Sequence, residues 1–303
     1  MIKLYSVSRW AVVLLALLAT TLMLTVVAGA QGIDPGGSPV AKRIIDNGVL
    51  RVGVNPQFKP FSFATADNQQ AGVDIDIAKL LAKQLGVKLE ILVPDSFSQL
   101  IPMLLNDQID VIMAGMTINF KRAKVVNFTN PYFNTGLSIL LNKAKASRLG
   151  LNGVTSYQEL MASLKASGRE GKLVIAVTKG KSPARSVPVY FPKAQVQEYA
   201  TNEEAAQAVA DGKAHIMVHD EIFLKVWLND HKDSVMYRLT VFPKPFKPDY
   251  YGFAVRKGNQ ELVNMLNVFI SELYVEDYIN RFMTTYLPPQ VKPAKFDVGE
   301  SEL

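Results

Sequence analysis

The stretch that decides the fold is GVDIDIAKLLAKQLGVKLEILVP, residues 72–94. Its first part places four apolar residues on one helical face: Ile77, Leu80, Leu81 and Leu85. Gly86 then ends the helical pattern, and KLEILVP has the composition of a strand. A helix that leads directly into a strand is the repeating unit of α/β folds.

The same alternation extends to both sides of this stretch. VLRVGV (49–54) predicts a strand before it, and IDVIMAG (109–115) predicts a strand after it, with a helix over Phe97–Asn106 in between. The resulting order is β-α-β-α-β. This order predicts a mainly parallel sheet with helices on both faces.

A second α/β unit begins after SILLN (138–142). It comprises the strand and turn LVIAVTKGKS (173–182), the strand AQVQEYA (194–200), the helix NEEAAQAVADGK (202–213) and the strand-to-helix segment AHIMVHDEIFLKVWL (214–228). The strand YYGFAVRKGN (250–259) follows, with helices over Gln260–Tyr274 and up to about Tyr286. Two units joined by two extended crossings predict two lobes with a cleft between them.

The predicted boundaries follow from these units. We expect lobe 1 to comprise residues 45–140 and 245–290, and lobe 2 to comprise residues 141–244. Residues 31–44 are interpreted as a linker, because QGIDPGGSPV is rich in Gly and Pro. Residues 291–303 are interpreted as a flexible tail.

The first 30 residues have the pattern of a secretory signal peptide. Lys3 and Arg9 precede the uncharged run Trp10–Ala30, which ends in Ala-Gly-Ala. Cleavage near Ala30 would release the chain into the periplasm. The alternative is an uncleaved membrane anchor, because about 20 apolar residues can span a bilayer.

The amino-acid composition limits the compartment and the kinds of ligand that can be expected for this protein. The 303-residue chain has no cysteine, so an exported form has no disulfide framework, and the bacterial periplasm is the expected compartment. Its formal charge of +6 comes from scattered basic residues, which weakly favours an anionic ligand. Without a basic stripe carrying interleaved aromatic residues, nucleic acid is not an expected partner.

Arg122 is the first candidate site residue. It follows the strand at 109–115 together with Gly115 and Thr117. Ligands of open α/β sheets collect at the carboxyl ends of strands, and a guanidinium matches a carboxylate with two hydrogen bonds. The alternative is an ordinary solvated surface arginine.

Asp220 is the second candidate, at the end of Ile216–His219. It is either the N-cap of the helix that follows or a carboxylate that receives an ammonium group across the cleft. Glu221 beside it is then an exposed neighbour or an acid/base candidate.

Other candidates carry weaker signals. Phe58 and Phe97 lie in loops after two strands, where they either pack in the core or wall a ligand pocket. The turn TKGKS (178–182) offers backbone N–H groups to an anion, but it lacks the spacing of a phosphate-binding loop. The three histidines, His215, His219 and His231, lack metal-ligand spacing, so no metal site and no cofactor are expected.

Together these segments resemble the family 3 extracellular solute-binding proteins, the amino-acid receptors of ABC importers. The resemblance covers about residues 45–287. It is carried by GVDIDIAKLLAKQLG (72–86), SFSQLIPMLLNDQIDVIMAGMTINFKRAKVVNFTNPYF (96–133), HIMVHDEI (215–222) and YYGFAVRKGN (250–259). It implies a two-lobe periplasmic-binding-protein fold of type II with two hinge crossings, a monomer, and an inner-membrane ABC permease as partner.

The resemblance also implies roles for individual residues. Arg122 corresponds to the arginine that pairs with the α-carboxylate of the ligand, next to Thr117 and with the Gly115 carbonyl near the ammonium. Asp220 corresponds to the carboxylate that receives the ammonium. Ser182 falls where the family commonly has a carboxylate-binding Thr, and Phe58 and Phe97 match the aromatic walls of the side-chain pocket.

Two departures from the family pattern leave the ligand open. Gly180-Lys181-Ser182 replaces a Gly-Thr-Thr or Gly-Ser-Thr turn, so Lys181 adds a positive charge near the cleft. Ala114 and Gly115 stand where some relatives have serines. An amino acid is expected, with room for a dicarboxylate or another anionic solute.

The expected mechanism is capture without turnover, in which a zwitterion bridges Arg122 and Asp220 and stabilises the closed lobes. The protein is therefore not expected to be an enzyme. The alternative is a periplasmic dehydratase of the cyclohexadienyl dehydratase type, which shares this scaffold, with Glu221 as its acid. A sensor on the same scaffold is a third reading.

Overall fold

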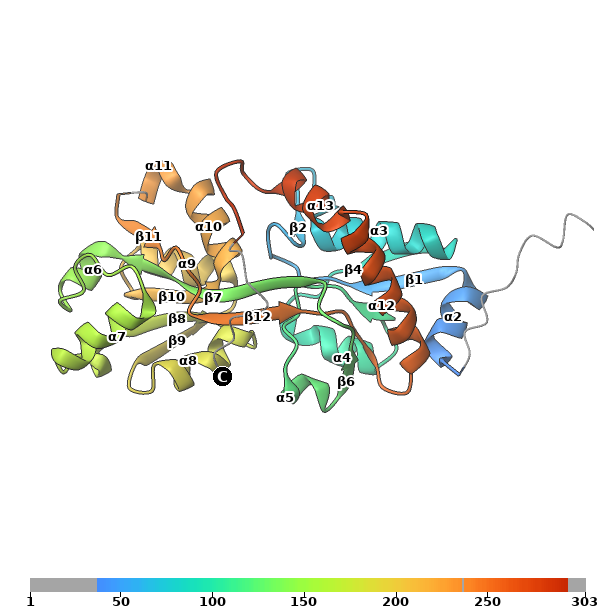
Figure 1. The fold of residues 1–303 in the computed structure, drawn as a ribbon, viewed down its shortest axis with the longest axis horizontal. Helices are drawn as coiled ribbons and strands as arrows, with labels where there is room; N and C mark the ends of the chain where they lie inside the picture. The colour runs from blue at the N-terminus through green and yellow to red at the C-terminus, as the bar shows by residue number, and fades with distance from the viewer. Residues whose placement is uncertain (1–36, 236, 294–303) are drawn as a thin grey trace, which may run out of the picture. The chain divides into compact units, whose positions relative to one another are not determined.

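A computed structural model describes residues 37–235 and 237–293 (Figure 1). The proposed signal segment 1–30 and residues 294–303 of the proposed tail lie outside the described residues. Two large sheets and a two-stranded one form the framework, and the α/β fold predicted from the sequence is confirmed.

The first large sheet has the strand order β4-β1-β5-β13-β6. Its strands are β1 Val49–Gly53, β4 Lys88–Leu92, β5 Val111–Ile112, β6 Val126–Phe128 and β13 Ala254–Arg256. β1 pairs in parallel with β4 and β5, whereas β13 pairs antiparallel with β5 and β6. The two-stranded sheet, β2 Phe63–Ala64 and β3 Gln70–Ala71, lies in the connection after β1.

The second large sheet has the order β11-β7-β10-β8-β9, with β12 also paired to β7. Its strands are β7 Phe133–Asn142, β8 Val174–Thr178, β9 Gln195–Tyr199, β10 Ile216–Asp220, β11 Leu239–Val241 and β12 Lys247–Tyr251. β8 pairs in parallel with β9 and β10, whereas the pairs that involve β7 are antiparallel. Both large sheets are therefore mixed, and only part of each has the parallel pairing that the β-α-β order predicted.

Two neighbouring strands carry the chain between the sheets. β7 leads away from the first sheet and β12 leads back to it, and the two pair antiparallel from Phe133↔Tyr251 to Leu137↔Lys247 (Figure 1). β13 follows β12 after two residues. Because the returning chain enters the first sheet in the direction opposite to β5 and β6, β13 pairs antiparallel with both. β7 is hydrogen-bonded within the second sheet over 137–141, and the lobe boundaries at 140 and 245 remain a proposal.

Helices cover both faces of the sheets. They are α2 Pro39–Asn47, α3 Val73–Leu85, α4 Leu100–Leu105, α5 Phe120–Ala123, α6 Lys143–Ser147, α7 Tyr157–Ala166, α8 Ser182–Tyr190, α9 Asn202–Ala210, α10 Glu221–Asp230, α11 Lys232–Val235, α12 Gln260–Val275 and α13 Tyr278–Tyr286, with single 3-10 turns at Phe97–Gln99 and Glu170–Lys172. Side chains on the two faces of a strand pack into different hydrophobic cores. In β7, Leu140 joins one hydrophobic cluster while its neighbours Ile139 and Leu141 join another, as the period of a strand requires.

Helix α2 begins at Pro39, inside the segment 31–44 that the sequence analysis interpreted as a linker. Ser38 caps its first turn, because its hydroxyl accepts from the Ala41 N–H, and Pro39 fits the first helical position. Val40 and Ile44 are buried against the first core. Burial of its apolar face therefore stabilises this short helix, although the residues before it are rich in Gly and Pro.

Helix α3 confirms the prediction from residues 72–86. Gly72 precedes it at φ +125°, and a Cβ there would lie 2.3 Å from the Phe61 carbonyl oxygen, so no other residue fits. Gly86 ends it in the left-handed conformation. Across the described parts of the chain, no helix has both the length and the apolar character that crossing a bilayer requires.

Candidate functional site

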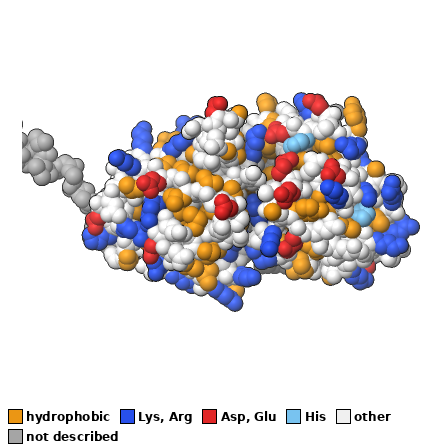
Figure 2. All heavy atoms as spheres, turned by 180° about the vertical axis from the view of Figure 1, so that it is seen from behind, with side chains coloured by type: hydrophobic (Ala, Val, Ile, Leu, Met, Phe, Trp, Pro, Cys, Tyr) orange, Lys and Arg blue, Asp and Glu red, His pale blue; other side chains and the backbone are white. Residues whose placement is uncertain are grey.

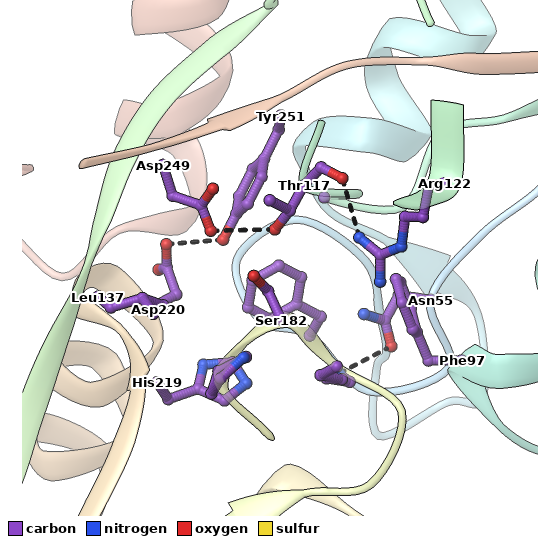
Figure 3. Close-up of a pocket in the computed structure, with 14 residues that line it drawn as sticks. Asn55, Phe97, Thr117, Arg122, Leu137, Ser182, His219, Asp220, Asp249 and Tyr251 are labelled. Atoms are coloured by element: carbon purple, nitrogen blue, oxygen red, sulfur yellow. Dashed lines mark hydrogen bonds between the residues drawn. The ribbon is translucent and has the colours of Figure 1, made fainter. Parts of the chain in front are cut away.

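A pocket with about 330 Å³ of free space, its open mouth included, lies where connections of the two large sheets meet (Figure 3). It is lined by all seven residues that the sequence singled out, namely Phe58, Phe97, Gly115, Thr117, Arg122, Ser182 and Asp220. It is also lined by Asn55, Leu137, Lys181, Pro183, His219, Asp249 and Tyr251. That these residues bind a ligand remains a prediction.

The topology explains why these residues meet. The connections after β1, β4 and β5 carry the residues from Asn55 to Arg122. The connection after β8 carries Lys181 and Ser182, and Asp220 is the last residue of β10. The pocket thus lies at the carboxyl ends of the parallel strands of both sheets, where open α/β sheets bind ligands.

Three polar contacts join the loop after β1 to the second sheet's connections. Lys59 Nζ lies 2.8 Å from Asp230 Oδ2, and Asn202 Nδ2 donates to the Gln57 carbonyl at 3.1 Å. Lys181 Nζ lies 3.5 Å from Asn55 Oδ1. The two halves of the pocket are therefore in contact in this arrangement.

Arg122 is a buried cation, with 6% of its surface exposed. It sits on the short helix α5, whose cap is the Asn119 side chain. Its Nη1 donates to the Thr117 carbonyl at 2.9 Å, and its guanidinium carbon lies 5.2 Å from the centre of the Phe97 ring. No carboxylate of the described residues lies within 4.0 Å of the guanidinium. Burial and the nearby Arg185 lower the pKa of Arg122 to about 9, which leaves it charged at neutral pH.

Lys181 is the second buried cation of the pocket, with 9% of its surface exposed. Its Nζ lies 5.2 Å from the centre of the Phe58 ring and 5.2 Å from the centre of the Phe97 ring. Burial, together with the positive charge of Arg122, lowers the pKa of Lys181 to about 7. The two rings predicted as pocket walls thus flank the protein's own ammonium group.

Asp220 fulfils the capping hypothesis and also lines the pocket. Its Oδ1 accepts from the N–H groups of Ile222 and Phe223 at 2.9 and 3.1 Å, which caps helix α10. Its Oδ2 accepts from the hydroxyls of Thr135 and Tyr251, the latter at 2.6 Å (Figure 3). Burial raises the pKa of Asp220 to about 6 against the effect of these hydroxyls.

Asp249 and Tyr251, on the crossing strand β12, were missed by the sequence analysis. The Thr117 hydroxyl donates to Asp249 Oδ2 at 3.1 Å, and Lys247 Nζ lies 3.6 Å from Asp249 Oδ1. Burial raises the pKa of Asp249. The only sequence signal for them was an acid beside two tyrosines at the start of YYGFAVRKGN. Alternation along β12 turns Asp249 and Tyr251 to the same side.

Gly115 connects the pocket to the first sheet's helix α3. It has φ +54°, and a Cβ would lie 2.4 Å from the Phe58 ring, so glycine is required there. The Gly115 backbone hydrogen-bonds the buried Asp74. The Tyr132 hydroxyl donates to Asp74 Oδ1 at 2.5 Å. Residues from two of the sequence motifs, 72–86 and 96–133, thus contact one another behind the pocket.

His219 contributes a neutral imidazole to the pocket wall. The Asn202 amide donates to the Gln57 carbonyl, so its oxygen faces His219 Nε2 at 3.1 Å, and Nε2 carries the proton. Burial and Lys181 hold the pKa of His219 well below its usual value. Its buried Nδ1 is an acceptor with no hydrogen-bond partner among the described residues. No group of His, Cys, Asp and Glu in the described chain could hold a metal ion.

Glu221, the acid considered for an enzymatic function, does not line this pocket. It is fully buried on α10 and forms an ion pair with Lys225. Ser182 lines the pocket at the first position of α8.

Known proteins resemble the chain over most of its length. The model of bacterial extracellular solute-binding proteins, family 3, matches residues 50–289. The glutamine-binding protein GlnH of a Bacillus subtilis ABC transporter is 30% identical over 88% of this chain and 89% of its own. Cyclohexadienyl dehydratase of Pseudomonas aeruginosa is 31% identical over 59% of this chain and 62% of its own. The crystal structure of AncCDT-1, an ancestral amino acid-binding protein and precursor of cyclohexadienyl dehydratase, has a TM-score of 0.69 and 31% identity, and covers 83% of this chain and 100% of its own.

Proposed function

Because the chain belongs to the bacterial extracellular solute-binding proteins of family 3, we propose that it captures an amino acid in the pocket and delivers it to an ABC transporter permease. Its fold is the type II, two-lobe fold of the periplasmic amino-acid-binding proteins. The proposal includes export to the periplasm through cleavage near Ala30, and a monomeric state.

One observation carries this proposal. Arg122 is a buried guanidinium that faces a cleft and has no carboxylate partner among the described residues. A buried charge is costly unless it is paired, and the planar guanidinium fork matches a carboxylate with two hydrogen bonds. The carboxylate of a bound solute supplies that partner.

The opposite side of the pocket suits the ammonium group of an amino acid. Asp220 and Asp249 present carboxylate oxygens there, and His219 Nδ1 offers a further acceptor. The hydroxyls of Tyr251 and Thr117 hold these carboxylates in position (Figure 3). The ligand thus bridges residues that follow strands of both sheets, which favours the arrangement in which the sheets' connections meet.

The surface agrees with a small-molecule ligand. Figure 2 shows acidic and basic side chains interspersed over one face, without a single basic stripe. Such a distribution does not favour nucleic acid.

Thermal-shift screening of the twenty amino acids and common dicarboxylates tests the proposal, because a ligand that binds only the folded protein raises its melting temperature. We expect Arg122→Ala to abolish the shift of every ligand while its circular dichroism remains that of the wild type. Arg148→Ala, which changes an exposed arginine, is the matched control. A full shift in Arg122→Ala would remove the proposed role of this residue.

We propose capture without turnover. The dehydratase relative makes the enzyme the alternative, but Glu221 lies outside the pocket lining and is paired with Lys225. Incubation with prephenate or arogenate tests this. We expect both compounds to remain unchanged, and product formation above that of the buffer would contradict the proposal.

A further inference from the structure

Lys181 fills the space between two aromatic side chains of the pocket. Its Nζ lies 5.2 Å from the ring centres of both Phe58 and Phe97, and the side chain is 91% buried. These rings face a cation of the protein itself, in a pocket where a ligand side chain was expected to lie between them. The geometry is that of two cation–π contacts.

No acidic group of the described chain neutralises this ammonium. Among the described residues its Nζ has one hydrogen-bond partner, the neutral Asn55 amide oxygen at a long 3.5 Å, and no carboxylate lies within 4.0 Å of it. The charged group that acts on it most is Arg122, which has the same sign. The pocket therefore holds two buried basic side chains near one another, and neither has a carboxylate of the described chain within 4.0 Å.

The two acids of the pocket have partners other than Lys181, and neither forms an ion pair with it. Asp220 accepts four hydrogen bonds, from Ile222, Phe223, Thr135 and Tyr251. Asp249 accepts hydrogen bonds from the Thr117 hydroxyl and the Tyr250 N–H, and it forms an ion pair with Lys247. A single α-carboxylate placed on Arg122 leaves Lys181 without a counter-charge, so burial then favours its neutral amine, whereas a second carboxylate beside it would hold it as an ammonium.

We infer, on the basis of the proposed function, that the captured solute is a dicarboxylic amino acid, with its α-carboxylate on Arg122 and its side-chain carboxylate on Lys181. The ligand then supplies one anion for each buried cation, and its ammonium lies toward Asp220 and Asp249. A cationic side chain is rejected, because it would have to displace Lys181 from the two rings while facing two like charges.

Calorimetric titration of the purified protein tests this inference. L-glutamate and L-aspartate are compared with their amides, L-glutamine and L-asparagine, which have nearly the same shape but a neutral side chain. L-arginine serves as the cationic probe. We expect one of the two acids to bind at least tenfold more tightly than its own amide, and L-arginine to bind more weakly than that acid.

The decisive variant is Lys181→Met, whose unbranched side chain is one atom shorter than that of lysine and carries no charge. We expect it to reduce the ratio of acid to amide affinity at least tenfold. Lys179→Met removes an exposed charge two residues away in the same turn, outside the lining of this pocket, and is expected to leave the ratio unchanged.

The outcomes separate this inference from the proposed function. Tighter binding of an amide or of L-arginine to the wild type, or an unchanged ratio in Lys181→Met, would overturn the dicarboxylic ligand while leaving amino-acid capture in place. If no amino acid binds the wild-type protein at all, both fail together.

Discussion

Asp74 shows how a single buried side chain supports the pocket from behind. It is fully buried on α3, accepts from the Tyr132 hydroxyl, and is bonded by the Gly115 backbone. Burial raises the pKa of Asp74 to about 7. The motif that decided the fold thus also fixes the glycine against which Phe58 packs.

This raised pKa makes stability depend on pH. Between the unfolded pKa of about 4 and the folded pKa of about 7, the folded protein holds a proton that the unfolded chain has lost. The contribution of Asp74 to the free energy of unfolding is therefore fully present below about pH 4 and is lost as pH rises toward 7, by up to about 1.4 kcal/mol per pH unit.

Urea denaturation of the wild type and Asp74→Asn at pH 5 and pH 8 measures this contribution. We expect the wild type to lose stability relative to the variant on going from pH 5 to pH 8. The exposed Asp67→Asn is the control and should follow the wild type. Parallel curves for the wild type and Asp74→Asn would show that Asp74 is ionised in the folded protein throughout this range.

At the scale of elements, the junction of β10 and α10 has two tasks. Asp220 ends the strand, caps the helix through two backbone N–H groups, and presents its other oxygen toward Tyr251 and the pocket. The sequence left capping and ligand binding as alternatives. In the structure one carboxylate has the geometry for both, because its two oxygens point to different partners.

Two substitutions separate these tasks. Asp220→Asn keeps an oxygen for the cap but loses the charge, whereas Asp220→Ala loses both. We expect the alanine variant to lose about 1 kcal/mol or more of unfolding free energy and the asparagine variant to lose less. Both variants should bind the amino acid at least tenfold more weakly. If Asp220→Asn binds the amino acid with wild-type affinity, Asp220 acts only as the cap of helix α10.

Much of the element pattern could be predicted from local sequence. Helix α3 was expected within 72–86 and spans Val73–Leu85, and the helix expected over Gln260–Tyr274 is α12, Gln260–Val275. The convergence of the candidate residues was predictable because they follow parallel strands. Short elements were missed: α5 has four residues and β6 three, too few to show a period.

The charge arrangement of the pocket could not be predicted in the same way. Lys181 lies between rings 84 and 123 residues away in sequence, and Asp249 is buried on a crossing strand by packing that no local pattern encodes. The change from Gly-Thr-Thr to Gly-Lys-Ser indicated a charge near the cleft. Its position between Phe58 and Phe97 became visible only in three dimensions.

At the scale of the whole described molecule, the two large sheets are linked covalently only by β7 and β12 within residues 37–293, and these strands lie side by side. Adjacent links allow one sheet to rotate against the other about a single axis. A ligand that contacts both sides of the pocket favours the arrangement in which the loops meet.

The absence of cysteine from the sequence makes this motion measurable. Dyes on Leu105→Cys and Val189→Cys, exposed positions on α4 and α8, report the separation of the two halves. We expect energy transfer between them to rise when the amino acid is added. A pair on the second half alone, Val189→Cys and Val196→Cys, should not respond. A ligand that raises the melting temperature without changing the first pair would contradict closure.

The enclosure of the pocket has a practical consequence. Its charged walls are almost completely shielded from water, so we expect an occupant to exchange slowly and to leave faster when the halves part. Protein isolated from cells should therefore carry its natural cargo through purification. Denaturing it and analysing the released small molecules by mass spectrometry would identify that cargo before any compound is added.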